Sequence, residues 1–176
     1  LFIDDDVAVL TGNNLNPRAW TLDLENRLVL RDPARLLEAF PTMHDEESRA
    51  EIWFALWRML YRPAVVPDAA YAAVPHLLVI GDAFPLHERV QAFHLVARIE
   101  IARRAPESAR MPDDLVVAYA NAMDDLPRRV ADAAREPWTE EEARICAAAL
   151  LAGKRQPEVA RTLLEAGPDG RSELTY

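Results

Sequence analysis

The chain of 176 residues contains a single cysteine, Cys146, and only five glycines. One cysteine cannot form an intramolecular disulfide, which excludes a small secreted scaffold held together by such bonds. Cys146 lies in an apolar run and is predicted to be a small core residue. The four histidines lack the Cys/His spacing of a zinc site, so the sequence predicts neither a metal nor another cofactor.

Long hydrophobic runs are also absent. No uninterrupted apolar stretch approaches the roughly 20 residues that a transmembrane helix needs, so no transmembrane segment is expected. The sequence opens on the apolar residues Leu1–Ile3 rather than on a basic segment, and it therefore lacks a signal-peptide pattern. A start inside a strand-like run suggests that further residues precede Leu1. The expected location is the cytoplasm.

Basic residues are scarce, because 20 Lys and Arg stand against 29 Asp and Glu and give a net charge of −9. Such an acidic chain lacks the positive surface that neutralises phosphates, so nucleic acid is not an expected partner. The local group Arg103, Arg104 and Arg110 is interpreted as solvated helix surface. Lys154 is the only lysine, which limits the catalytic motifs that this sequence can contain.

The first 33 residues have the pattern of short strands. Leu1–Ile3 and Val7–Leu10 are apolar runs on either side of a polar turn, and Leu24–Leu30 is predicted to be a third strand. Two or three strands of this length cannot bury a sizeable core by themselves. This part of the chain therefore needs a partner sheet or support from the helical residues after it.

From Ala34 onward, apolar residues recur at helical spacing between short breaks marked by Pro or Gly. We expect a break at Pro127 and a capping box at Thr139. Such a succession is typical of stacked helical hairpins forming an irregular solenoid, with a compact bundle as the alternative. The helices are predicted over residues 45–61, 68–80, 86–104, 112–136, 139–153 and 157–166.

One segment has a sharp chemical signature. Asp4 is followed, after residues 5–10, by Thr11-Gly12-Asn13-Asn14 and then by Leu15-Asn16-Pro17-Arg18. This segment resembles the second half of the HKD motif of the phospholipase D superfamily, in which HxKxxxxD precedes Gly-Ser-x-Asn. Within that superfamily it looks most like the bacterial phosphatidylserine synthases.

The resemblance implies a role for each matching residue. In the family, a His attacks the phosphodiester, and the motif Asp orients a His by accepting its second ring N–H. Asp4 would be that Asp, and Asn14 would stabilise charge on the phosphoryl oxygens. By the same resemblance Asn16, Arg18 and Glu25 are expected to bind substrate. CDP-diacylglycerol would be the donor and serine the acceptor, without a metal, at the inner face of the membrane.

The lysine count sets a limit on this activity. The pattern HxK needs a Lys two residues after a His, but Lys154 is preceded at that distance by Ala152. The motif spacing places the expected His before Leu1. The sequence therefore predicts an incomplete, C-terminal fragment of a phosphatidyltransferase site, which would take its two substrates only with the upstream half present. The fragment alone is predicted to be inactive.

The helical part resembles bacterial HEAT-repeat-like proteins of unassigned function. The segments 69–78 and 114–119, with Trp53 and Trp57 upstream, carry this resemblance over residues 36–165. It implies a surface that accepts a protein partner. The alternative to the enzyme hypothesis is therefore a non-enzymatic HEAT-like interaction module.

These observations combine into one expected organisation. The predicted fold is mainly α, with stacked HEAT-like helical hairpins preceded by a small β segment from a phospholipase D-type fold. The predicted domains are a partial phospholipase D-like β segment over residues 1–33, a helical domain over 34–168 and a frayed tail over 169–176.

Overall fold

The structure is a computed structural model that describes three strands near the N-terminus and residues 46–166 apart from 64 and 109. The strands are β1 (Phe2–Asp4), β2 (Val7–Thr11) and β3 (Arg27–Leu30). They pair antiparallel in the order β1-β2-β3. Short aliphatic and β-branched runs favour such pairing.

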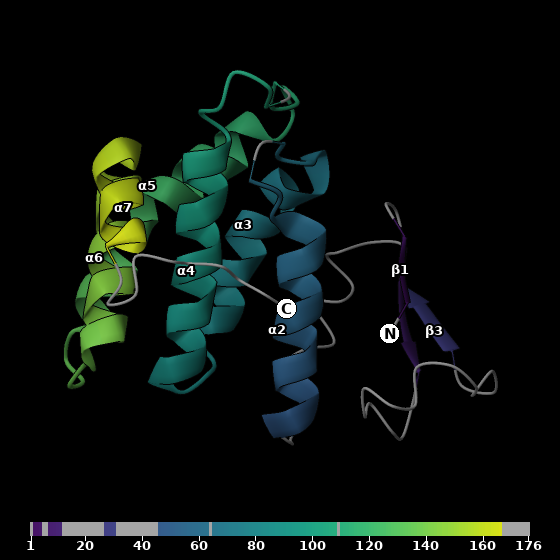
Figure 1. Cartoon of the computed structure of the whole chain (residues 1–176), viewed down its shortest axis with the longest axis horizontal. Helices are drawn as coiled ribbons and strands as arrows, with labels where there is room; N and C mark the ends of the chain where they lie inside the picture. The colour runs from purple at the N-terminus through teal and green to yellow at the C-terminus, as the bar shows by residue number, and fades with distance from the viewer. Residues whose placement is uncertain are drawn as a thin grey trace.

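Six helices follow within residues 46–166 (Figure 1), and all but α5 agree closely with the predicted bounds. The predicted capping box is confirmed, since Thr139 Oγ1 accepts from the Glu142 amide at 3.2 Å and the Glu142 carboxylate accepts from the Thr139 amide at 2.8 Å. The helices are α2 (Glu46–Leu60), α3 (Asp68–Gly81), α4 (Leu86–Ala102), α5 (Val116–Ala133), α6 (Glu140–Gly153) and α7 (Pro157–Glu165).

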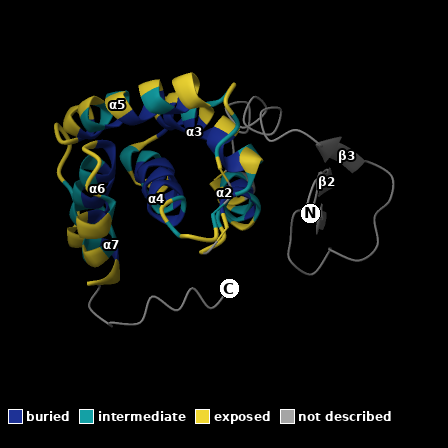
Figure 2. Cartoon of the chain, turned by 90° about the horizontal axis from the view of Figure 1, so that it is seen from above, coloured by how far each residue is buried: buried dark blue, intermediate teal, exposed yellow. Residues whose placement is uncertain are grey.

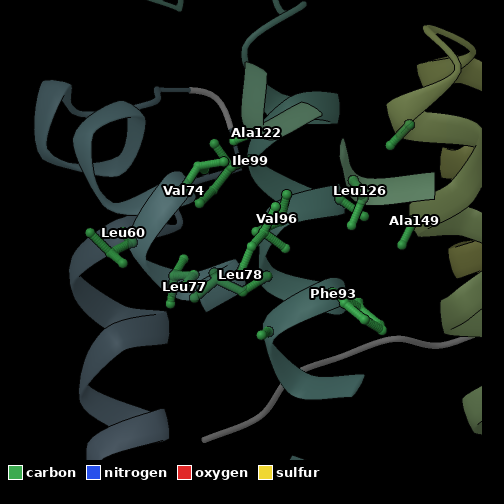
Figure 3. Packing of buried hydrophobic residues seen from close by; sticks show 14 of the residues in the cluster. Leu60, Val74, Leu77, Leu78, Phe93, Val96, Ile99, Ala122, Leu126 and Ala149 are labelled. Carbon is green, nitrogen blue, oxygen red and sulfur yellow. The ribbon is translucent and has the colours of Figure 1, made fainter. Parts of the chain in front are cut away.

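Helix α4 is the centre of the helical part. It packs mainly against α3, α6 and α7, and viewed from above it lies among the other helices (Figure 2). Phe93, Val96 and Ile99 of α4 are fully buried, and with Leu77 of α3 and Leu126 of α5 they belong to one hydrophobic cluster (Figure 3). In a solenoid each repeat contacts only its neighbours, so a central helix favours the compact bundle.

The prediction of a small β segment from a phospholipase D-type fold is wrong. Residues 46–166, where the structure describes them, form six helices and no strand. Strands β1–β3 have three to five residues each and make a plain antiparallel meander, which is too small to form a layer with a core of its own. Residues 46–166, where described, are therefore all-helical, and the mainly α part of the prediction fits.

Helix α5 departs from the prediction at two places. It begins at Val116 rather than near Pro112, and it continues through Pro127 without a break. Proline lacks the N–H that would bond to the Met123 carbonyl. At that point α6 approaches closely, because a Cβ built on Gly153 would lie 2.8 Å from Pro127 Cδ and 3.0 Å from the Met123 oxygen. The Pro127 ring of α5 thus lies directly against Gly153 of α6, where the absence of a side chain leaves room for it.

This close approach makes Gly153 sensitive to substitution. Gly153→Ala is expected to lower the free energy of unfolding by about 1 kcal/mol, because overpacking against a ring and a backbone oxygen outweighs the higher helix propensity of Ala. Gly81→Ala is the matched control, since its Cβ would meet Ala92 Cβ at 3.1 Å, and it is expected to be nearly neutral. Urea unfolding midpoints measure both effects. If Gly81→Ala is the more damaging change, the packing argument is wrong.

Candidate functional site

The residues predicted from the phosphatidyltransferase motif lie near the N-terminus. Asp4 is the last residue of β1, where its Cα is paired with that of Val7 in β2. The other predicted site residues, Asn14, Asn16, Arg18 and Glu25, lie outside the described residues. The prediction that these five side chains form one site therefore stays a prediction.

A cavity of about 460 Å³ lies in the helical part, where the sequence predicts no catalytic or substrate-binding residue. Its walls come from the end of α4, the first turns of α5 and the segment between them, with Tyr71 of α3 on one side and Arg155 beyond α6 on another. This volume falls within the range of small-molecule sites.

Glu100, in the last turns of α4, is a buried acidic residue in the cavity wall, with a side chain that is 2% exposed. Its carboxylate accepts hydrogen bonds from the Tyr119 hydroxyl at 2.8 Å, from Arg103 Nη2 at 2.8 Å and from Arg103 Nε. Arg104 Nη2 makes a single longer contact with it at 3.3 Å. A buried carboxylate needs such partners, so these groups hold one another in place.

The electrostatics of this group are set by burial and by the Glu100 charge. Burial raises the pKa of Tyr119 well above its usual value, and the neighbouring Glu100 carboxylate raises it further. Burial opposes the charge on Arg103, but the hydrogen bond and charge of Glu100 outweigh it and raise the pKa of that guanidinium. At neutral pH Tyr119 is therefore a neutral donor and Arg103 a fixed cation.

The cavity rim carries further charges. Arg110 pairs with Asp113 at 3.0 Å, and both side chains are largely exposed. Arg155 lies 3.6 Å from Asp124 and has a φ of 61°, in the left-handed region that disfavours most residues. The Gln156 amide donates to the Leu151 carbonyl. This bond, around a residue with a positive φ, is the Schellman motif that ends many helices. The end of α6 thereby places Arg155 at the cavity.

The interpretation of Arg103, Arg104 and Arg110 as solvated surface fits the exposed Arg104 and Arg110 but not Arg103, and all three side chains line the cavity. Arg103 is part-buried against the Tyr119 ring, with its guanidinium carbon 5.5 Å from the ring centroid. One feature of the sequence could have indicated this buried ion pair. Glu100 is an acidic residue between the apolar Ile99 and Ile101, and arginines follow it three and four positions later on the same helix face.

Two further titratable groups lie away from this cavity. Cys146 is fully buried, which confirms it as a core residue, and burial raises the pKa of its thiol to about 12. Burial, with the positive charges of Arg98 and Arg144, lowers the pKa of His94 to about 3. Within the described part of the chain, no three His, Cys, Asp or Glu side chains gather as a metal site. No helix there is both long and apolar enough to cross a bilayer.

Part of the chain is similar to bacterial phosphatidyltransferases. It is 50% identical over 46 residues to the CDP-diacylglycerol–serine O-phosphatidyltransferase PssA of Escherichia coli, a match that covers 26% of this chain and 10% of that enzyme. It is 56% identical over 39 residues to the CDP-diacylglycerol–serine O-phosphatidyltransferase of Haemophilus influenzae, covering 22% of this chain and 9% of the enzyme. The matches thus span about a tenth of these curated relatives.

No protein-family model matches the chain, and no solved structure is significantly similar to it. The partial homology supports the predicted resemblance to phosphatidylserine synthases for one stretch of the chain. The HEAT-like resemblance has no such support, and the hypothesis of a HEAT-like interaction module stays a prediction.

Proposed function

We propose that residues 1–33 are the C-terminal part of the active site of a CDP-diacylglycerol–serine O-phosphatidyltransferase, joined to a helical domain over residues 34–168. The observation that carries this proposal is the 50% identity with the Escherichia coli enzyme over 46 residues. An enzyme acting on CDP-diacylglycerol would work at the inner face of the membrane. This proposal gives no role to the helical domain, which would be an addition to the phosphatidyltransferase.

The proposed roles rest on the chemistry of phosphoryl transfer through a His nucleophile. Asp4 accepts the second ring N–H of a His and so fixes its tautomer and orientation. Asn14 donates from its side-chain amide to a phosphoryl oxygen as negative charge develops there. Asn16, Arg18 and Glu25 contact the substrates. The sequence contains no HxK, because its only lysine is Lys154, so the nucleophile must come from outside this chain.

A graft into the homologous enzyme tests these roles. The 46 residues of this chain that match the Escherichia coli phosphatidyltransferase replace the corresponding stretch of that enzyme, and the purified chimera is assayed for phosphatidylserine formation. The chimera is expected to be active. Asp4→Asn in the graft is expected to lower kcat about 10³-fold, because a His without its carboxylate partner loses the correct tautomer. This chain alone is expected to form no phosphatidylserine above a blank without protein.

Asp5→Asn is the matched control in the same graft, since it removes an equal charge one residue away and lies outside the motif. It should leave kcat unchanged. The proposal fails if a folded chimera is inactive, or if the Asp4 and Asp5 substitutions have equal effects. Turnover by the isolated chain would contradict the need for an external nucleophile.

A further inference from the structure

The charges around the cavity beside Glu100 do not balance. Four guanidinium groups line it, those of Arg103, Arg104, Arg110 and Arg155, against the three carboxylates of Glu100, Asp113 and Asp124. Arg110 and Arg155 each have an acidic partner at the rim. Arg103 and Arg104 share one carboxylate between them, so the cavity has one positive charge in excess.

This excess lies on Arg104. Arg103 engages both Glu100 oxygens with two N–H groups, whereas the one bond from Arg104 to Glu100 is 3.3 Å long. The Arg104 side chain is 42% exposed, and the guanidinium carries five N–H donors in all. An anion can therefore bind to Arg104 without displacing the Glu100–Arg103 pair.

The remaining walls suit an anion with a small apolar body. The Tyr71 and Ser108 hydroxyls lie 3.5 Å apart and also line the cavity, so they add polar surface to its walls. Met111, Val116 and Met123 contribute apolar surface to the same cavity. A pocket with mixed walls and a few fixed polar groups is the usual form of a small-molecule site. Glu100, held by Tyr119 and Arg103, keeps the polar side rigid before any ligand binds.

We propose that this cavity binds a small organic anion, with its carboxylate or phosphate group on Arg104 and its apolar part against Met111 and Met123. The site depends only on residues of the helical part. It is therefore independent of the proposed phosphatidyltransferase function, and either proposal can fail without the other.

Calorimetric titration of the full chain with benzoate and, separately, with phenyl phosphate tests the proposal. Saturable binding of at least one probe is expected, and the tighter probe identifies the preferred anionic group. Arg104→Gln is expected to weaken binding about tenfold, which corresponds to one charge-assisted hydrogen-bonded contact. Arg104→Lys keeps the positive charge, so its affinity for the probe should lie between that of the unmodified chain and that of Arg104→Gln.

Arg161→Gln is the matched control. Arg161 is 39% exposed and has a weak ion pair with Glu158 within α7, and it does not line the cavity. This variant should bind the probes as the unmodified chain does, and far-ultraviolet circular dichroism confirms that all variants are folded. The proposal is overturned if neither probe binds, or if Arg104→Gln binds as tightly as Arg161→Gln.

Discussion

Glu100→Leu is expected to lower the free energy of unfolding by about 3 kcal/mol, because it removes the shared carboxylate partner of a buried hydroxyl and a part-buried guanidinium. Leucine has a similar volume, so packing changes little. The buried Tyr119 hydroxyl loses its acceptor, and the part-buried Arg103 guanidinium loses the carboxylate that balances its charge. Urea unfolding at neutral pH measures the loss as a shift in midpoint at constant slope.

Glu107→Leu is the control for this substitution, since Glu107 is exposed in the segment after α4 and should change stability by no more than about 0.5 kcal/mol. A double-mutant cycle with Tyr119→Phe isolates the hydrogen bond, and residues in such contact are expected to couple by about 1–3 kcal/mol. Equal costs for Glu100→Leu and Glu107→Leu would show that the Glu100 contacts do not stabilise the fold.

Local patterns in the sequence predict most of the helices. The capping box at Thr139 needs only residues 139–142, and the end of α6 at Gly153 is indicated by the apolar run before it. Pro127 shows where local reasoning stops. Whether a proline breaks a helix depends on what packs against it, and here Gly153 of α6, which has no side chain, leaves room for the Pro127 ring. The start of α5 at Val116 rather than near Pro112 also differs from the local pattern.

The cavity could not be found from spacing. Most of its lining residues lie between Glu100 and Asp124, but Tyr71 of α3 and Arg155 after α6 complete the walls, and no regular spacing connects them to that stretch. A motif search is sensitive to residues that lie together along the chain, such as Asp4 to Arg18. It is insensitive to a site that is completed by residues far apart in the sequence, such as Tyr71 and Arg155 here. The motif therefore led to the similarity with phosphatidyltransferases, whereas the arginine cluster was interpreted as surface.

Acid is expected to destabilise the fold through His94, by about 2 kcal/mol between pH 7 and pH 5. Burial first, and then Arg98 and Arg144, lower its pKa from 6.5 to about 3 in the folded chain. The unfolded chain takes up a proton near pH 6.5, whereas the folded chain does not. The stabilisation is thus complete above pH 6.5 and is lost progressively as the pH falls toward 3. Urea unfolding at both pH values measures it.

His94→Gln separates this effect from general acid sensitivity. Glutamine does not titrate, but its carbonyl oxygen can still accept the hydrogen bond that Arg98 Nε donates to His94 Nε2 at 3.3 Å. The variant loses the edge contact with Trp57, whose ring centroid lies 4.8 Å away, so it is less stable at pH 7.

The loss of stability of His94→Gln between pH 7 and pH 5 should nevertheless be about 2 kcal/mol smaller than that of the unmodified chain. His76→Gln, at an exposed position of α3, should leave the pH dependence unchanged. If His94→Gln and the unmodified chain lose stability equally, a buried neutral His94 is not the cause.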